Sequence, residues 1–108
     1  MTQFDNREKA FESKYAHDQE LAFKVMARRN KLLGLWAAGE MGLSGDAAAE
    51  YAKDVVKSDF QEAGDDDVFR KVKADLDAKQ VAITDHRLRK EMEDLLVEAK
   101  RQVMEELQ

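Results

Sequence analysis

Apolar side chains recur every three or four residues along most of the chain, which is the spacing of amphipathic helices. The pattern falls into four segments, separated by glycines or by residues that favour the start of a helix. It predicts helices over residues 18–41, from the turn at 44–46 to about 64, from 65 to about 79, and from 84 to the end of the chain. We therefore expect one all-α domain, a four-helix bundle over residues 18–108.

The last predicted helix carries the most regular apolar stripe in the chain. The stripe consists of Leu88, Met92, Leu95, Leu96, Ala99, Val103 and Leu107. We expect it to pack against the first helix, at Leu21, Val25, Leu32 and Trp36. Outside the stripe, opposite charges four residues apart predict a solvated face with weak ion pairs. These pairs are Arg87 with Glu91, Arg89 with Glu93, Lys90 with Asp94 and Arg101 with Glu105.

Turn and capping residues support the predicted boundaries. Gly42 and Gly64 are expected to end the first and second helices, because glycine favours the left-handed conformation that follows many helices. Ser44 or Asp46 is expected to cap the second helix, and Thr84 the fourth. The three aspartates at 65–67 suit the start of the third helix, where carboxylates interact favourably with the helix dipole.

The first 17 residues have few large apolar side chains compared with the rest of the chain, and they predict a separate arm. Their only large side chains after Met1 are Phe4, Phe11 and Tyr15, which fall within about 40° of one another on a helical wheel. Burying each contributes about 1.5–3 kcal/mol, whereas ordering about 15 residues costs about 1–2 kcal/mol apiece. We therefore expect a mobile arm over residues 1–17 that becomes helical on a partner. The alternative is an ordinary frayed terminus.

Charged residues surround the three aromatic residues of the arm. They include Arg7, Glu8, Glu12 and Lys14. On a partner, the aromatic side chains would supply the buried anchors, and these charges would set the register of the arm. We therefore take all seven residues as candidates for partner binding.

A second candidate surface lies on the first helix, where Lys24, Arg28 and Lys31 share one face. They are predicted to dock on an acidic surface, and the alternative is a solvated edge. The neighbouring Arg29 projects into the apolar sector instead, and we expect it to pair with a carboxylate or to extend along its stem. Residues 44–67 carry eight acidic and two basic side chains, so they offer the first helix an acidic partner.

The first helix also has a second apolar line on its far side. This line consists of Phe23, Ala27, Gly34 and Met41. It indicates either a central position in the bundle or a contact surface.

Composition narrows the possible functions. A net charge of -5 argues against nucleic-acid binding, which depends on clustered basic side chains. The chain has no cysteine, no apolar signal-peptide segment and no stretch long enough to span a membrane. We therefore expect a cytoplasmic protein that does not insert into the membrane.

Catalytic and metal-binding motifs are missing from the sequence. The residues three positions before His17 and His86 are not glutamates, so the Glu-x-x-His pairs of a di-iron bundle do not occur. The aspartates at 65–67 lack the glycine of a calcium-binding loop, and the five glycines form no phosphate-binding loop. We therefore expect no enzyme activity and no cofactor.

Long sequence strings resemble a known family, the zeta subunit of the F-type ATP synthase of alphaproteobacteria. They are Phe4-Asp5-Asn6-Arg7-Glu8, Ala16-His17-Asp18, RRNKLLGLWAA from Arg28 to Ala38, YAKDVVKSDFQEAGDDDVFRKV from Tyr51 to Val72, and the final helix. One departure is Ala47, which stands where an acidic residue would complete a capping box with Ser44.

The resemblance implies a four-helix inhibitor of wasteful ATP hydrolysis. Its arm would insert between the alpha and beta subunits of the catalytic head, close to gamma, and become helical there. The protein would then be a monomer when free and peripheral to the inner membrane through the ATP synthase. Two alternatives stay open: a helical adaptor or dimerising protein without inhibitory activity, and a small enzyme or nucleotide-binding bundle.

Overall fold

The computed structural model describes residues 19–59 and 65–107, and this part of the chain has an all-α fold. Its helices are α2 (Gln19–Glu40), α3 (Gly45–Ser58), α4 (Asp66–Ala78) and α5 (Asp85–Glu106). The predicted four-helix architecture is confirmed, and no strand occurs within the described ranges. The predicted arm over residues 1–17 lies outside the described residues.

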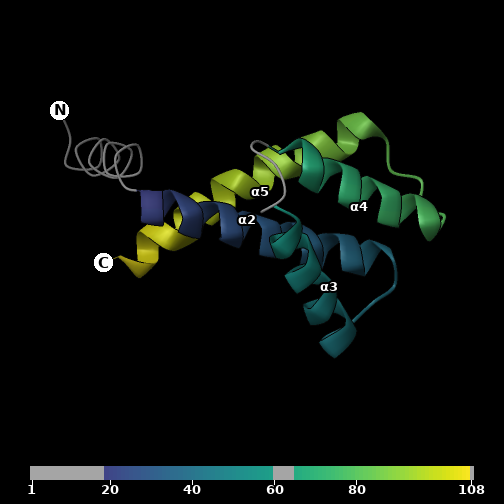
Figure 1. Ribbon diagram of the computed structural model, residues 1–108, viewed down its shortest axis with the longest axis horizontal. Coiled ribbons are helices and arrows are strands. Elements are labelled where there is room, and N and C mark those ends of the chain that lie inside the picture. Colours follow the sequence, from purple (N-terminus) through teal and green to yellow (C-terminus); the bar gives the residue numbers. More distant parts are fainter. Residues whose placement is uncertain (1–18, 60–64, 108) are drawn as a thin grey trace.

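Helix α2 is the central helix of the bundle. It packs against each of the other three helices, most extensively against α3 and α5. In Figure 1, α5 runs alongside α2, and α4 lies beside α5. The central position accounts for Gly34 and Met41 of the second apolar line, whereas Phe23 at the other end of this line is 54% exposed.

A close approach between α2 and α3 depends on Gly34. A Cβ atom at this position would lie 2.6 Å from the Cα of Ala52 and 3.3 Å from Cγ2 of Val55. Separations below 3 Å are not tolerated without movement of the backbone. Glycine at position 34 therefore lets the two helices pack closely at this point.

The larger apolar core contains buried residues from all four helices. It consists of Leu33, Ala37, Val55, Val68, Val72, Leu76, Leu88 and Met92. Trp36 and Leu95 are partly buried against it. The predicted packing of the α5 stripe against Trp36 is therefore confirmed.

A second apolar cluster joins only α2 and α5. Its buried residues are Leu21 and Val25 from α2 and Ala99 and Val103 from α5, with Leu32 packed against them. This cluster confirms the remaining contacts predicted between the first and last helices. It lies at the end of the bundle where α2 begins and α5 ends (Figure 1).

The turn after α2 follows the predicted glycine stop. Gly42 has a φ of 81°, its N–H donates to the carbonyl of Gly39, and the N–H of Leu43 donates to the carbonyl of Ala38 at 2.8 Å. These two bonds satisfy carbonyls that the helix leaves unpaired at its end. Ser44 occupies the N-cap position of α3 with an extended backbone, and its side chain forms no capping hydrogen bond.

The predicted end of the second helix near Gly64 is wrong, because α3 ends at Ser58. The Ser58 hydroxyl donates to the carbonyl of Val55 at 2.6 Å, and the N–H of Asp59 donates to the carbonyl of Val56 at 3.3 Å. Each of these hydrogen bonds spans three residues instead of the four of a regular α-helix, as is common where a helix ends.

Polar contacts join α3 to α4 beside the larger core. The Tyr51 hydroxyl donates to Oδ2 of Asp75 at 2.8 Å, and Nζ of Lys71 donates to the same oxygen at 2.9 Å. Burial raises the pKa of Tyr51, and the hydrogen bond to Asp75 raises it further. The phenol therefore stays protonated and remains a hydrogen-bond donor at neutral pH.

Helix α5 starts as predicted, since Oγ1 of Thr84 accepts a hydrogen bond from the backbone N–H of Arg87 at 3.1 Å. Three of the predicted ion pairs are present: Arg87 with Glu91, Lys90 with Asp94 and Arg101 with Glu105.

The predicted pairing of Arg89 with Glu93 is wrong. The Arg89 guanidinium pairs with Asp66 of α4 at 3.1 Å and lies 3.9 Å from the centre of the Phe69 ring. A long cationic side chain can gain more from an aromatic face and a carboxylate on a packed helix than from an exposed neighbour on its own helix. Arg89 therefore links α5 to α4 instead of belonging to a purely solvated face.

Candidate functional site

The predicted partner-binding arm joins the bundle at the start of α2. Its candidate residues, Phe4, Arg7, Glu8, Phe11, Glu12, Lys14 and Tyr15, lie outside the described residues. The chain enters the described part at Gln19, beside the end of α5 (Figure 1). The structure therefore locates the base of the arm, and the roles of these seven residues remain predictions.

The base of the arm is held by contacts between α2 and α5. In addition to the apolar cluster of Leu21 and Val25 with α5, Nη1 of Arg28 donates to Oε1 of Gln102 at 2.9 Å. The other terminal nitrogen of Arg28 forms an ion pair with Glu106. The first turns of α2 are thus attached to α5 by both apolar and polar contacts.

The three residues of the predicted docking face have different environments. Lys24 and Lys31 are exposed, whereas Arg28 is half-buried by its contacts with α5. Arg28 therefore has a role within the bundle in addition to any role on a partner. The docking role of the set remains a prediction, and the two lysines are its freely accessible members.

Arg29 is one of the most completely buried side chains among the described residues, with 1% of its surface exposed. Its Nη2 lies 2.8 Å from Oδ1 of Asp65, and its Nε donates to Oδ1 of Asn30 at 2.7 Å. The predicted pairing of Arg29 with a carboxylate is confirmed. Asp65 belongs to the acid-rich segment, so this pair fixes α2 against the start of α4.

Asn30 and Asp59 complete this polar junction. Burial raises the pKa of Asp59, while the nearby Asn30 amide and the Arg29 guanidinium act in the opposite direction. Nδ2 of Asn30 has no partner at hydrogen-bonding distance among the described residues, so its influence on Asp59 is that of a nearby dipole. The junction connects α2 to the end of α3 and the start of α4.

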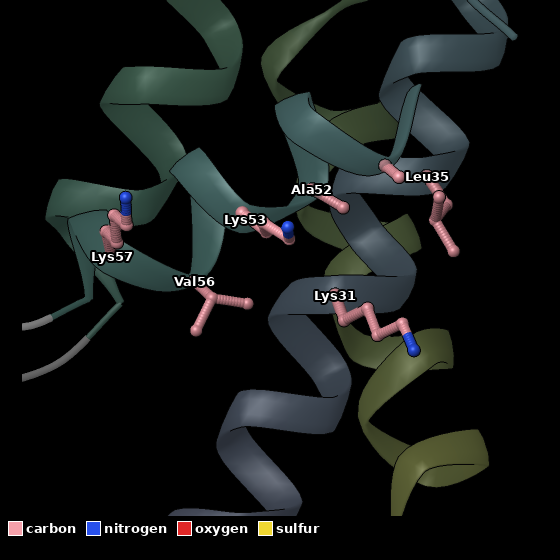
Figure 2. A pocket seen from close by; sticks show the side chains of 7 residues that line it. Lys31, Leu35, Ala52, Lys53, Val56 and Lys57 are labelled. Carbon is pink, nitrogen blue, oxygen red and sulfur yellow. The ribbon is translucent and has the colours of Figure 1, made fainter. Parts of the chain in front are cut away.

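A hollow of about 400 Å³ lies between α2 and α3. Lys31, Lys53 and Lys57 surround it, and its walls include Leu35, Ala52 and Val56 (Figure 2). Lys31 belongs to the predicted docking face, but the two lysines of α3 were not selected from the sequence. Their spacing of four residues places them on one side of α3, yet only the packing of α3 on α2 brings them to Lys31.

The described residues contain no group of three histidine, cysteine or acidic side chains arranged to hold a metal ion. His86 is exposed in the first turn of α5. Within the same ranges, none of the helices combines the length and the apolar character that a membrane span requires.

Two comparisons with known proteins match most of the chain. The family model described as ATPase inhibitor subunit zeta matches residues 1–102. Among solved structures, a protein with a solution NMR structure shares 52% sequence identity and gives a TM-score of 0.70. The match covers 78% of this chain and 95% of that chain. None of the curated proteins matches the chain.

Proposed function

Because this chain belongs to the family of the ATPase inhibitor subunit zeta, we propose that it is a non-catalytic regulator that inhibits ATP hydrolysis by the F-type ATP synthase. The observation that carries this proposal is the family match over residues 1–102, which includes both the arm and nearly all of the bundle. A relative at 52% identity with the same fold supports the assignment of the bundle.

In this proposal the arm performs the inhibition. Residues 1–17 become helical in continuation of α2 and enter the catalytic head between the alpha and beta subunits, close to gamma. Phe4, Phe11 and Tyr15 supply the buried contacts, because they share one side of such a helix. The arm wedges the head against rotation in the direction of hydrolysis, and the protein reaches the inner membrane only through the enzyme.

The bundle serves as the base of the arm. Its two apolar clusters are built from residues between Leu21 and Met104, so removing the arm leaves their described members in place. Contacts of Arg28 and Val25 with α5 hold the first turns of α2. A helix that extends α2 towards its N-terminus would therefore start from a fixed direction.

Deletion of residues 2–15 tests this proposal. The purified full chain and the deletion variant are added to the isolated ATP synthase head, and the rate of ATP hydrolysis is measured over a wide range of concentrations. The full chain should inhibit and the deletion variant should not, while the two should melt at nearly the same temperature. Inhibition by the deletion variant would refute the arm mechanism, and no inhibition by the full chain would refute the function.

Alanine substitutions distinguish the arm from the bundle as the binding element. Replacing Phe4, Phe11 and Tyr15 together should weaken inhibition by at least about a hundredfold, since buried aromatic anchors contribute about 2 kcal/mol or more each at an interface. Phe23→Ala is the matched control, because Phe23 is an aromatic residue of α2 with 54% of its surface exposed. A larger effect of Phe23→Ala would favour the adaptor alternative, in which the bundle itself binds.

A further inference from the structure

We propose that the hollow between α2 and α3 binds an acidic amphipathic helix on the surface of the ATP synthase head. Lys31, Lys53 and Lys57 would pair with carboxylates of that helix, and Leu35 and Val56 would contact its apolar side chains. The identity of the partner rests on the proposed function. The proposal adds a second contact, separate from the arm, that positions the bundle on its target.

The walls of the hollow suit apolar side chains of a partner. Ala52 and Val56 contribute from α3 and Leu35 from α2, and 39% of the Leu35 surface is exposed. The aliphatic stems of the three lysines extend this surface, since long cationic side chains can cover apolar partners while their charges stay in water. In Figure 2, Val56 points into the opening between the two helices.

The charges around the hollow are opposite to that of the whole chain, which has a net charge of -5. Among the ion pairs between described residues, none involves Lys31 or Lys57. Lys53 lies 3.5 Å from Glu50, but both side chains are largely exposed, and such pairs contribute little. The three ammonium groups can therefore bind carboxylates of a partner without breaking a stable contact.

The separation of the three lysines favours a helix over a small anion. In Figure 2 the ammonium groups of Lys57, Lys53 and Lys31 stand apart along the hollow and do not converge on one point. This arrangement offers no common point at which one phosphate or carboxylate would contact all three. A helix with acidic residues along both edges of an apolar stripe can contact all three, because its carboxylates are spread over successive turns.

Charge reversal tests the lysines of the hollow. The double variant Lys31→Glu with Lys57→Glu should bind the isolated head about tenfold more slowly than the parent, with a weaker dependence on salt. At saturating concentration it should still inhibit, because the arm is intact. Lys79→Glu with Lys90→Glu is the matched control, since both positions are exposed, both lie outside the predicted docking face and the hollow, and the net charge changes equally. Equal slowing by both double variants would overturn the proposal.

Carbodiimide coupling identifies the occupant directly. This reagent joins a lysine ammonium to a carboxylate that is in contact with it, and mass spectrometry locates the joined residues. We expect Lys31, Lys53 or Lys57 of the parent to be joined to acidic residues spaced three or four apart in one segment of the head. The proposal would be overturned if coupling occurred only through other lysines. It would also be overturned if added ATP removed these products while the protein stayed bound to the head.

The two proposals fail in different ways. If the parent does not inhibit the head at any concentration, the proposed function is wrong. If the parent inhibits and the reversal of Lys31 and Lys57 changes neither the association rate nor the coupling products, the function stands and the docking site is wrong.

Discussion

The two halves of α2 are held in different ways. Its C-terminal half lies among the other three helices, where Leu33 and Ala37 are fully buried in the larger core. The apolar cluster of its N-terminal half, around Leu21 and Val25, is shared with α5 and includes no residue of α3 or α4 among the described residues. The half that follows the predicted arm therefore has the smaller apolar core.

Two neighbouring arginines show the same difference in polar contacts. Arg29 is buried and pairs with Asp65 at the junction of α2 with α4. Arg28 is half-buried and bonds to Gln102 and Glu106 near the end of α5. Successive residues on a helix point about 100° apart, so adjacent arginines reach a buried junction and an accessible edge.

Local stability should follow this difference. Parts of a protein with few buried contacts open at lower free energy than the shared core. The first turns of α2 and the last turns of α5 should therefore open before the four-helix core.

The largest expected effect comes from Leu88→Ala in the four-helix core. Leu88 is fully buried, and replacing a buried leucine with alanine destabilises proteins by about 2–5 kcal/mol. We expect about 4 kcal/mol here, because the buried cluster that contains Leu88 includes residues of the other three helices, which limit its collapse. Urea denaturation measures the loss, and amide hydrogen exchange should become faster in all four helices.

Leu21→Ala is the matched substitution at the two-helix end, since Leu21 is 4% exposed. We expect about 2 kcal/mol, because neighbouring side chains and water can fill this site more easily. Exchange should become faster mainly in the first turns of α2 and the last turns of α5. An equal or larger loss for Leu21→Ala would mean that the two halves of α2 do not differ in stability.

A smaller effect is expected where α2 meets α3. Gly34→Ala should destabilise the protein by about 1–3 kcal/mol, because the added Cβ lies 2.6 Å from a backbone atom of Ala52. Gly39→Ala, in the same helix, meets nothing within 4 Å and should stabilise by about 0.5–1 kcal/mol. Thermal melting compares the two, and a gain of stability in both would show that the α2–α3 contact yields easily.

Periodic patterns predicted the helices and most of their packing. The α5 stripe from Leu88 to Val103 packs in the two apolar clusters with Leu21, Val25 and Trp36 of α2, because amphipathic spacing reports which side of a helix is buried. The last member of the predicted stripe, Leu107, lies beyond the end of α5 and is 47% exposed. The place of Arg29 in an apolar sector indicated either a pair with a carboxylate or extension along its stem, and the structure shows the pair with Asp65. These features depend on residues within one helix, which a sequence displays directly.

Features that depend on how helices cross could not be predicted. Arg89 pairs with Asp66 of α4, whereas the spacing along α5 indicated Glu93. Lys53 and Lys57 line the same hollow as Lys31 because α3 packs against α2. The sequence shows each of these side chains but not the distance between their helices, so the hollow was missed.

The smallest expected effect is a pH dependence at the two-helix end. Glu98 accepts hydrogen bonds from Arg101 and from Gln102, and Gln102 in turn accepts one from Arg28. The bond from Arg101 contributes most to lowering the pKa of Glu98 from about 4.5 to about 2. A carboxylate with a lowered pKa stabilises the folded state above its unfolded pKa, and this contribution is lost as the pH falls. The loss should therefore occur between about pH 4.5 and pH 2.

Comparison of Glu98→Gln with the parent isolates this contribution. The variant should be slightly less stable at neutral pH, and the difference should shrink as the pH approaches 2 and in about 1 M salt, which screens exposed charges. Glu93→Gln makes the same change of charge elsewhere on α5. The difference between its pH profile and that of the parent measures the effect of the charge alone, and this difference is subtracted from the result for Glu98→Gln. Urea midpoints and hydrogen exchange in the last turns of α5 provide the measurement. Parallel profiles for Glu98→Gln and the parent would show that the chain from Arg28 to Glu98 does not stabilise the end that carries the arm.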